Sequence, residues 1–295
     1  MSAGFKPSRA RGFTLVEAIV AIVIIGVIGA VVAVFIRAPA QAYADTAARA
    51  AASDEADLAL RRIARDLRLA LPNSVRVNGD GSAVEFLLTR TGGRYLSVDD
   101  DVDSFPVLDF DNKDKKKFTA VGGTMRDIEP GDYIVVYNLG EETVPSDAYQ
   151  YNEPGTEKNI AKVTGRDDSK PNHPIVEMEG NPFAAQKNPM QSPSSRFQVV
   201  TGPVSYACEP ASDGGNALVR YWSYPISKTQ KKPPAGSPKR AVIATRVAEC
   251  SQIFRYGSDA TRRSALVIIR LALRLDNDPA ARVRLVSQVH VDNTP

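Results

Sequence analysis

The longest apolar stretch of the chain lies near its start. Residues 13–36 hold a single charged side chain, Glu17, in 24 positions. At about 1.5 Å per helical residue this run extends roughly 36 Å, enough to cross a hydrocarbon core of about 30 Å. The pattern therefore predicts a transmembrane helix over residues 13–36.

An amphipathic pattern follows over residues 37–72. Leu60, Ile63 and Leu67 recur at steps of three and four residues, which is typical of a helix that buries one face. The remaining faces carry charged residues, namely Arg61, Arg62, Arg65, Asp66 and Arg68. We expect Pro39 to kink or locally melt this helix, and Pro72 to end it.

From residue 73 to residue 295 the chain shows strand and turn patterns. Residues 75–77 and 84–88 flank the turn sequence Asn78-Gly79-Asp80-Gly81, which predicts a hairpin. Residues 266–275 and 283–291 predict a second pair of strands, joined by a turn at 276–279. Single strands are expected at 134–137, 197–200, 218–224 and 241–245, and long loops or insertions at 96–127 and 141–192. The predicted fold class is α+β, with the long N-terminal helix packed on an antiparallel β-sheet head.

The charge balance changes this picture little. The formal net charge is +3, but Lys6, Arg9 and Arg11 precede the apolar run, and the rest of the chain has 34 basic and 34 acidic residues. Nucleic-acid binding requires an excess of Lys and Arg. No nucleic-acid partner is therefore expected.

Glu17 is the feature of the apolar run that requires an explanation. A charged carboxylate in hydrocarbon costs about 2.5–3.5 kcal/mol on insertion scales, so such a residue indicates a function. An ordinary secretory signal has a shorter apolar region, of about 7–15 residues. A plain single-pass anchor accounts for the basic residues before the run, which keep the N-terminus in the cytoplasm, but leaves Glu17 unexplained.

The sequence Gly12-Phe13-Thr14-Leu15-Val16-Glu17, after a short basic leader, resembles the prepilin signal of type IV pilins and pseudopilins. The resemblance implies that a prepilin peptidase removes residues 1–12 by cutting between Gly12 and Phe13, and methylates the new terminus. Glycine permits close approach of a protease to the backbone. The amine created at Phe13 is a cation at neutral pH, and Glu17 lies one helical turn away. In the family this glutamate is thought to pair with the terminal amine of a neighbouring subunit.

Further patches resemble minor pilins of the mannose-sensitive haemagglutinin (MSHA) pilus system. They cover residues 65–77, 132–140, 192–208 and 286–295. The resemblance implies a structural subunit that acts in filament initiation at or near the tip. It implies as partners the peptidase, other minor pilins, the major pilin and the inner-membrane assembly platform. The protein is then expected to cross the bacterial inner membrane once, with a periplasmic head at 73–295, before it joins a surface filament.

Three alternatives to this function stay open. A minor pseudopilin of type II secretion differs only in the machine that it joins. A minor pilin for DNA uptake is expected to carry a basic, aromatic stripe on its head. A membrane-anchored periplasmic enzyme requires catalytic groups gathered by the fold.

Cys208 and Cys250 are the only cysteines, and the predicted topology places both outside the cytoplasm. An even pair in an oxidising compartment predicts a disulfide, with two free buried thiols as the alternative. Closing this loop is expected to stabilise the fold by about 4 kcal/mol.

The sequence gives little support for a metal site or for catalysis. Asp99, Asp101 and Asp103 lie in an acidic stretch that suits calcium by its oxygen atoms, but the spacing lacks the glycine and terminal glutamate of an EF-hand loop. We expect a solvated loop there, with calcium as a weak alternative. His173 and His290 are the only histidines, and no metalloprotease, nucleophile-elbow or phosphate-loop motif is present. We therefore expect neither an enzyme nor a cofactor.

Overall fold

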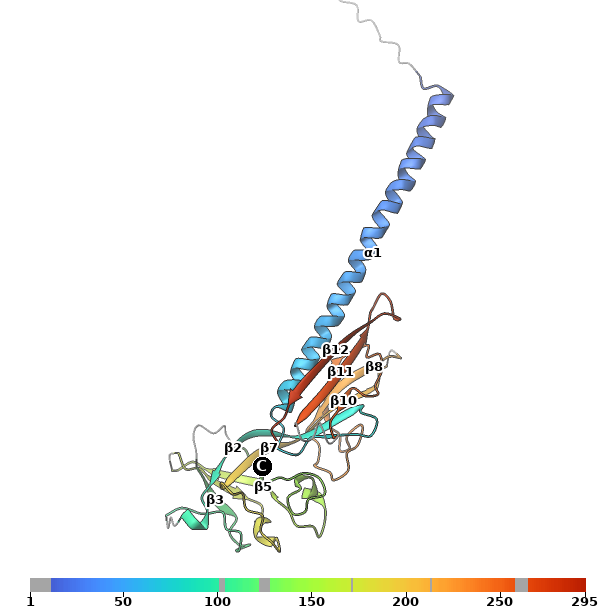
Figure 1. The fold of residues 1–295 in the computed structure, drawn as a ribbon. Coiled ribbons are helices and arrows are strands. Elements are labelled where there is room, and N and C mark those ends of the chain that lie inside the picture. The colour runs from blue at the N-terminus through green and yellow to red at the C-terminus, as the bar shows by residue number, and fades with distance from the viewer. Residues whose placement is uncertain (1–11, 101–103, 122–127, 171, 213, 258–264) are drawn as a thin grey trace, which may run out of the picture. The chain divides into compact units, whose positions relative to one another are not determined.

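A computed structural model describes residues 12–100, 104–121, 128–170, 172–212, 214–257 and 265–295 of the chain. The chain divides into two compact units, residues 1–51 and residues 52–295. The first contributes the apolar part of helix α1 (Leu15–Leu67), and the second contains its last turns and all of the strands (Figure 1).

Helix α1 departs from the expected pattern at two positions. It is continuous through Pro39, so the local melting predicted there is wrong. One proline removes one N–H donor, and the adjoining turns keep theirs. The helix also ends at Leu67, before the predicted end near residue 72. The backbone N–H of Leu71 donates to Leu87 O at 2.8 Å and that of Thr89 to Leu69 O at 2.7 Å, so sheet pairing replaces helical bonding.

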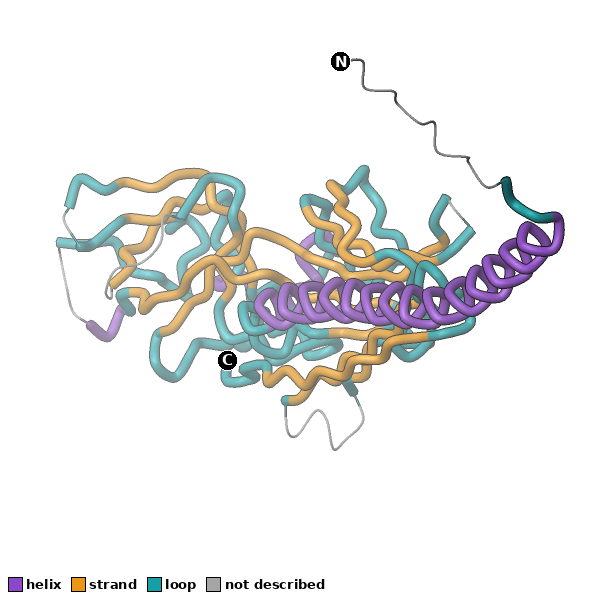
Figure 2. Tube along the Cα trace, turned by 90° about the horizontal axis from the view of Figure 1, so that it is seen from above, coloured by secondary structure: helices purple, strands orange, loops and turns teal. Residues whose placement is uncertain are grey.

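The head consists of strands and loops (Figure 2), and the strands pair antiparallel, which confirms the predicted fold class. The predicted hairpin is present as β1 and β2, and the predicted final pair as β11 and β12. The strands are β1 (Arg76–Val77), β2 (Ala83–Tyr95), β3 (Lys117–Val121), β4 (Tyr133–Val135), β5 (Ile160–Asp167), β6 (Ile175–Met178), β7 (Arg196–Pro210), β8 (Asn216–Trp222), β9 (Lys239–Ala244), β10 (Phe254–Arg255), β11 (Leu266–Arg274) and β12 (Arg282–His290). Short 3-10 helices η1 (Val98–Asp100), η2 (Ala148–Asn152) and η3 (Phe183–Ala185) interrupt the loops.

The two regions predicted as long loops are not structureless. They contain β3, β5 and β6, so the prediction of loops is wrong there, whereas that of insertions is not contradicted. These strands complete a closed circuit of antiparallel pairings, β2–β3–β6–β5–β4–β7–β2. The circuit encloses an apolar core that includes Tyr95, Phe118, Ile134, Val176 and Phe197. Each strand contributes only a few apolar residues. The core is complete only when segments that are distant in sequence come together.

Two long strands connect this barrel to the rest of the head. β2 and β7 pair along their lengths, and the register shifts between Leu88 and Thr91. Such an irregularity bends a strand pair. We call residues 89–200 the barrel lobe and residues 52–88 with 201–295 the helix lobe.

The helix lobe packs the end of α1 into its core. Ala56, Ile63 and Leu67 are fully buried, and the same core includes Val204 on β7 and Ile269 on β11. Two sheets contribute residues to this core: the nine-stranded sheet, which contains β1 to β9, and the three-stranded sheet β10–β11–β12. The amphipathic period of residues 52–67 is therefore confirmed.

Asp66 does not lie on the solvent face that the pattern assigned to it. It is only 6% exposed, and its Oδ2 accepts from Tyr206 OH at 2.7 Å and from Arg220 Nε at 2.8 Å. Burial, followed by the Asp66 carboxylate, raises the pKa of Tyr206 well above its usual range, so the phenol stays a donor. A buried ion pair therefore fixes α1 to β7 and β8.

Glu55 fixes the helix at a second point. Its carboxylate accepts from Thr245 Oγ1 at 2.8 Å and from Arg246 Nη2 at 2.7 Å. Burial alone raises the pKa of Glu55, but the hydrogen bonds from Thr245 and the Arg246 guanidinium outweigh it and hold the pKa below its ordinary value. The carboxylate is therefore charged at neutral pH.

Replacing Asp66 with alanine is expected to lower the free energy of unfolding by about 3–5 kcal/mol, because Arg220 stays buried without its countercharge. Urea denaturation of the detergent-solubilised chain, followed by fluorescence of the single tryptophan, Trp222, measures this loss. Asp57→Ala is the matched control, since Asp57 pairs with Arg61 on the exposed face of α1 and is expected to cost less than about 1 kcal/mol. Equal losses in the two variants would contradict the prediction.

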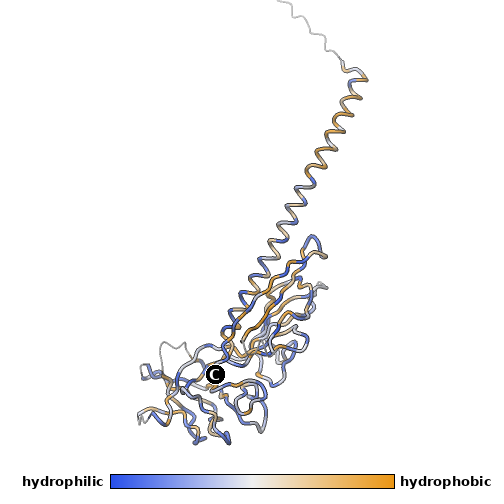
Figure 3. Tube along the Cα trace, viewed as in Figure 1, coloured by the Kyte–Doolittle hydropathy of each residue, from blue (hydrophilic) through white to orange (hydrophobic). Residues whose placement is uncertain are grey.

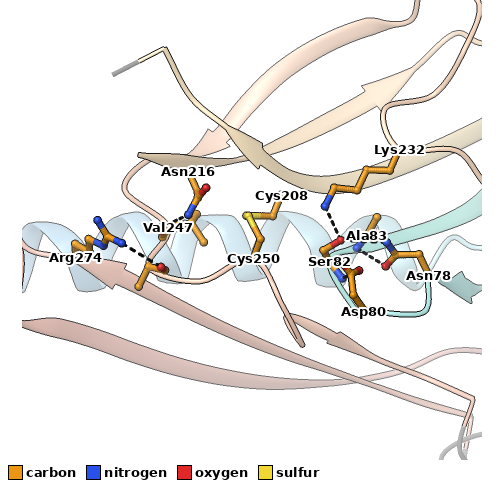
Figure 4. The surroundings of a disulfide bond; sticks show 11 residues. Asn78, Asp80, Ser82, Ala83, Cys208, Asn216, Lys232, Val247, Cys250 and Arg274 are labelled. Carbon is orange, nitrogen blue, oxygen red and sulfur yellow. Dashed lines mark hydrogen bonds between the residues drawn. A yellow bond between two sulfur atoms is a disulfide. The ribbon is translucent and has the colours of Figure 1, made fainter. Parts of the chain in front are cut away.

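The predicted disulfide is present (Figure 4). Cys208 on β7 is bonded to Cys250, with Cα atoms 5.3 Å apart. Cys250 lies in the segment between β9 and β10, which is also held where Asn216 Nδ2 donates to Val247 O at 3.3 Å and Arg274 Nη2 donates to Ala248 O at 3.4 Å. The bond therefore ties the nine-stranded sheet to the segment that leads into the three-stranded sheet.

Removing the disulfide in a Cys208→Ala/Cys250→Ala variant is expected to cost about 4 kcal/mol of stability, since the unfolded chain regains the freedom of that loop. The same urea titration, with and without reductant, measures it. Reductant should lower the stability of the wild-type protein and leave the variant unchanged. Equal stability of the oxidised and reduced wild-type protein would contradict this account.

Candidate functional site

Residues 12–14, which directly precede α1, are non-helical and exposed. Gly12, Phe13 and Thr14 lie outside the helix and are exposed, Phe13 to 79%. The predicted scissile bond between Gly12 and Phe13 therefore lies in an exposed segment that is neither helix nor strand. A Cβ built on Gly12 meets no atom within 4 Å, so the fold itself does not require glycine there.

Thr14 sets the start of the helix. Its Oγ1 accepts a hydrogen bond from the backbone N–H of Glu17 at 3.3 Å. This is the geometry of an N-cap residue that satisfies a free donor of the first turn. The order Thr-x-x-Glu also matches a capping box, in which the glutamate occupies the third helical position. The cap places Glu17 in the first turn of α1, close to the predicted cleavage point.

Every residue of the helix from 18 to 36 is apolar or glycine, and this end of the helix has mostly hydrophobic colours in Figure 3. The exposed large hydrophobic residues of this part run from Leu15 to Ile36, and include Ile22 at 70% and Ile25 at 69%. A helix that is apolar all round requires lipid or neighbouring helices around it. Over the described residues, α1 alone is long and apolar enough to span a membrane, by its length and composition.

Glu17 has no ion-pair partner within the described part of the chain. It is exposed among apolar neighbours, in the first turn of the helix. The positive end of the helix dipole favours a carboxylate in this position. The predicted partner of Glu17 is the terminal amine of a neighbouring subunit, which a single chain does not supply.

The predicted site residues therefore fall into three groups. Gly12, Phe13 and Glu17 lie together at the start of α1, and Cys208 with Cys250 forms the disulfide of the head. Of the calcium candidates, Asp101 and Asp103 lie outside the described residues, whereas Asp99 belongs to η1. The sequence reasoning gave Thr14 no role of its own, although its spacing from Glu17 carries the capping signal.

Comparison with known proteins identifies the N-terminal motif. Residues 7–33 match the family described as "Prokaryotic N-terminal methylation motif". The match spans the end of the basic leader, the Gly12–Phe13 junction and most of the apolar run. The chain thus carries a type IV pilin-like prepilin signal at the start of a long apolar helix. The comparisons with curated proteins and with solved structures gave no match.

Proposed function

We propose that the protein is a minor pilin-like structural subunit of a type IV pilus. The observation that carries the proposal is the junction at Gly12–Phe13, where a methylation motif meets an apolar helix that is too long for an ordinary secretory signal. Processing by a prepilin peptidase then leaves the helix in place as anchor and assembly element. The head faces the periplasm and later the filament surface, with the leader in the cytoplasm.

The finer assignment is to an MSHA-type pilus, with MshO as the minor pilin that the scattered sequence patches resemble most. In this role the subunit acts in filament initiation or assembly at or near the tip. The size of the head supports the position. A shaft stacks its subunits closely, whereas the barrel lobe adds a second folded body to the helix lobe, and such bulk fits best where fewer neighbours surround it.

The subunit is proposed to have no catalytic activity, because its assembly residues lie at the start of the helix and the sequence carries no catalytic motif. A type II secretion minor pseudopilin is the second candidate, since the motif is common to both systems. A DNA-uptake pilin and a membrane-anchored enzyme have less support. Neighbouring genes for pilus, secretion or DNA-uptake machinery separate the first three.

A clean deletion tests the proposal. We expect surface pili to be reduced or lost while the level of the major pilin in the membrane stays unchanged, because initiation fails rather than synthesis. Normal piliation in the deletion strain would favour the secretion or enzymatic alternatives. Crosslinking from the head in isolated pili tests the position, since contacts with the major pilin along the whole shaft would contradict a place near the tip.

A further inference from the structure

The head has a balanced total charge, but its acidic and basic residues are concentrated in different segments. Residues 96–195 contain 19 acidic and 10 basic residues, a net charge of −9, whereas residues 196–295 contain 7 acidic and 15 basic residues, a net charge of +8. The first segment builds most of the barrel lobe, and the second supplies β8 to β12 of the helix lobe. In Figure 1, β3 and β5 lie at one end of the head, and β8, β10, β11 and β12 at the other. The segregation in sequence is therefore also one in space.

The positive charge gathers on one face of the three-stranded sheet. Val267, Ile269 and Leu271 of β11 are buried, so the alternate residues of β11 and their partners in register on β10 and β12 face outward. The outward residues include five arginines, which we call the arginine face: Arg255, Arg270, Arg274, Arg282 and Arg284. Arg274 is directly opposite Arg282, an arrangement that costs stability unless an anion lies nearby.

Only part of this charge is neutralised within the chain. Arg282 forms an ion pair with Glu249. Arg270 and Arg284 are exposed, and among the described residues neither forms an ion pair. Both line a groove of about 450 Å³, together with Ser251, Gln252 and Glu249. The Glu249 carboxylate is paired with Arg282, so the groove still offers the two guanidinium groups of Arg270 and Arg284 to an anionic group.

A complementary surface exists on the same molecule. Residues 128–157 of the barrel lobe contain seven acidic residues and no Lys or Arg, and Lys158, the next residue, donates to Tyr151 O at 2.6 Å. Three of the seven are paired with Arg76 or Arg90. Glu142, Glu153 and Glu157 form no ion pair among the described residues, and each is at least partly exposed. We call residues 141–157 the acidic loop.

We propose that the arginine face of one copy docks on the acidic loop of a second copy of this chain. The contact joins two different surfaces, so it is heterologous, and each bound copy leaves one free surface of each kind. Such a contact builds an open row of heads rather than a closed dimer. The inference goes beyond the proposed pilus role and rests on the head alone.

A nucleic acid fits the arginine face less well than a second head. The outward residues of β10 to β12 carry no Phe, Tyr or Trp on which bases could stack. The net charge of −9 over residues 96–195 also repels a phosphate backbone. The acidic loop, by contrast, supplies carboxylates that match guanidinium groups in geometry and charge.

The test is sedimentation velocity of the full chain in detergent at about 50 mM and about 500 mM salt. We expect self-association at low salt that weakens at least about tenfold at high salt, because exposed charges are screened. An Arg270→Glu/Arg284→Glu variant and a Glu142→Lys/Glu153→Lys variant should each be monomeric. Mixed together they should associate again, since each keeps the one surface that the other has lost and the two reversed surfaces are also opposite in charge.

Lys116→Glu/Lys239→Glu is the matched control. It makes the same change in charge at two exposed positions, the residue before β3 and the first residue of β9, and should associate as the wild type does. A monomeric wild-type chain at low salt would overturn the proposal. Association that persists in both charge-reversed variants would overturn it too, because the contact would then lie in the apolar helices. Duplex DNA that binds the arginine face of a monomeric wild-type chain would assign the face to a different partner.

Discussion

Replacing Gly12 with leucine is expected to leave residues 1–12 attached to the protein. The peptidase must reach the backbone at the Gly12–Phe13 bond, and a branched side chain beside that bond obstructs the approach. The substitution should not disturb the fold, because a Cβ at Gly12 meets no atom of the chain within 4 Å. Any effect of the substitution therefore falls on processing rather than on folding. Intact-mass analysis from cells that express the peptidase should show the unprocessed mass, against a shortened and methylated wild-type protein.

Gly4→Leu is the control for this variant, since it changes a leader glycine away from the junction. The control protein should be cut normally. Retention of the leader in the wild-type protein would sink the assignment of the cleavage site. Normal cutting of Gly12→Leu, with Phe13 still the first residue, would show that the glycine has no part in recognition.

Sequence patterns predicted those parts of the fold in which neighbours in sequence carry the information. The helical period of Leu60, Ile63 and Leu67, the hairpin around residues 78–81 and the alternation after residue 282 are local signals, and each is found in the structure. The disulfide followed from a count of two cysteines and a predicted compartment. In these cases one segment suffices to reveal the element.

The barrel lobe shows what such local signals miss. β3 and β6 are five and four residues long, lie among charged residues, and pair with each other across more than fifty residues of sequence. Asp66 was assigned to the solvent face because it is charged, yet it is buried by Arg220, which is 154 residues further along the chain. The opposite net charges of residues 96–195 and 196–295 nearly cancel in the total. Only the fold shows that these two segments lie in different parts of the head.

Replacing Glu17 with glutamine is expected to exclude the protein from filaments. In the proposed assembly the carboxylate of Glu17 pairs with the terminal amine of a neighbouring subunit, and the pairing offsets the cost of a charge in lipid. Glutamine has nearly the same shape but no charge, so it cannot form that ion pair. Immunoblots of sheared pili against membrane fractions should show at least about a tenfold loss from the filament, equivalent to about 1.4 kcal/mol or more of lost pairing energy.

The structure offers a second explanation for the presence of Glu17, namely helix capping. The same variant distinguishes this explanation from a role in assembly. Thr14 caps α1 through the N–H of Glu17, and a glutamate at the third helical position is a normal part of a capping box. Glutamine serves in a capping box as well as glutamate does, so a residue needed only to start the helix tolerates Glu17→Gln. Thr14→Val makes the opposite change, because it removes the cap, at a cost of about 1 kcal/mol, and keeps the carboxylate.

The two variants together decide what Glu17 does. If the carboxylate acts in assembly, Glu17→Gln fails and Thr14→Val still enters filaments. If Glu17 only supports the start of the helix, Thr14→Val is the more damaging change and Glu17→Gln assembles as the wild type does. The same reasoning bears on position in the filament. A subunit at the extreme tip has no neighbour beyond it to supply an amine, so a requirement for the Glu17 carboxylate implies that another subunit lies further out.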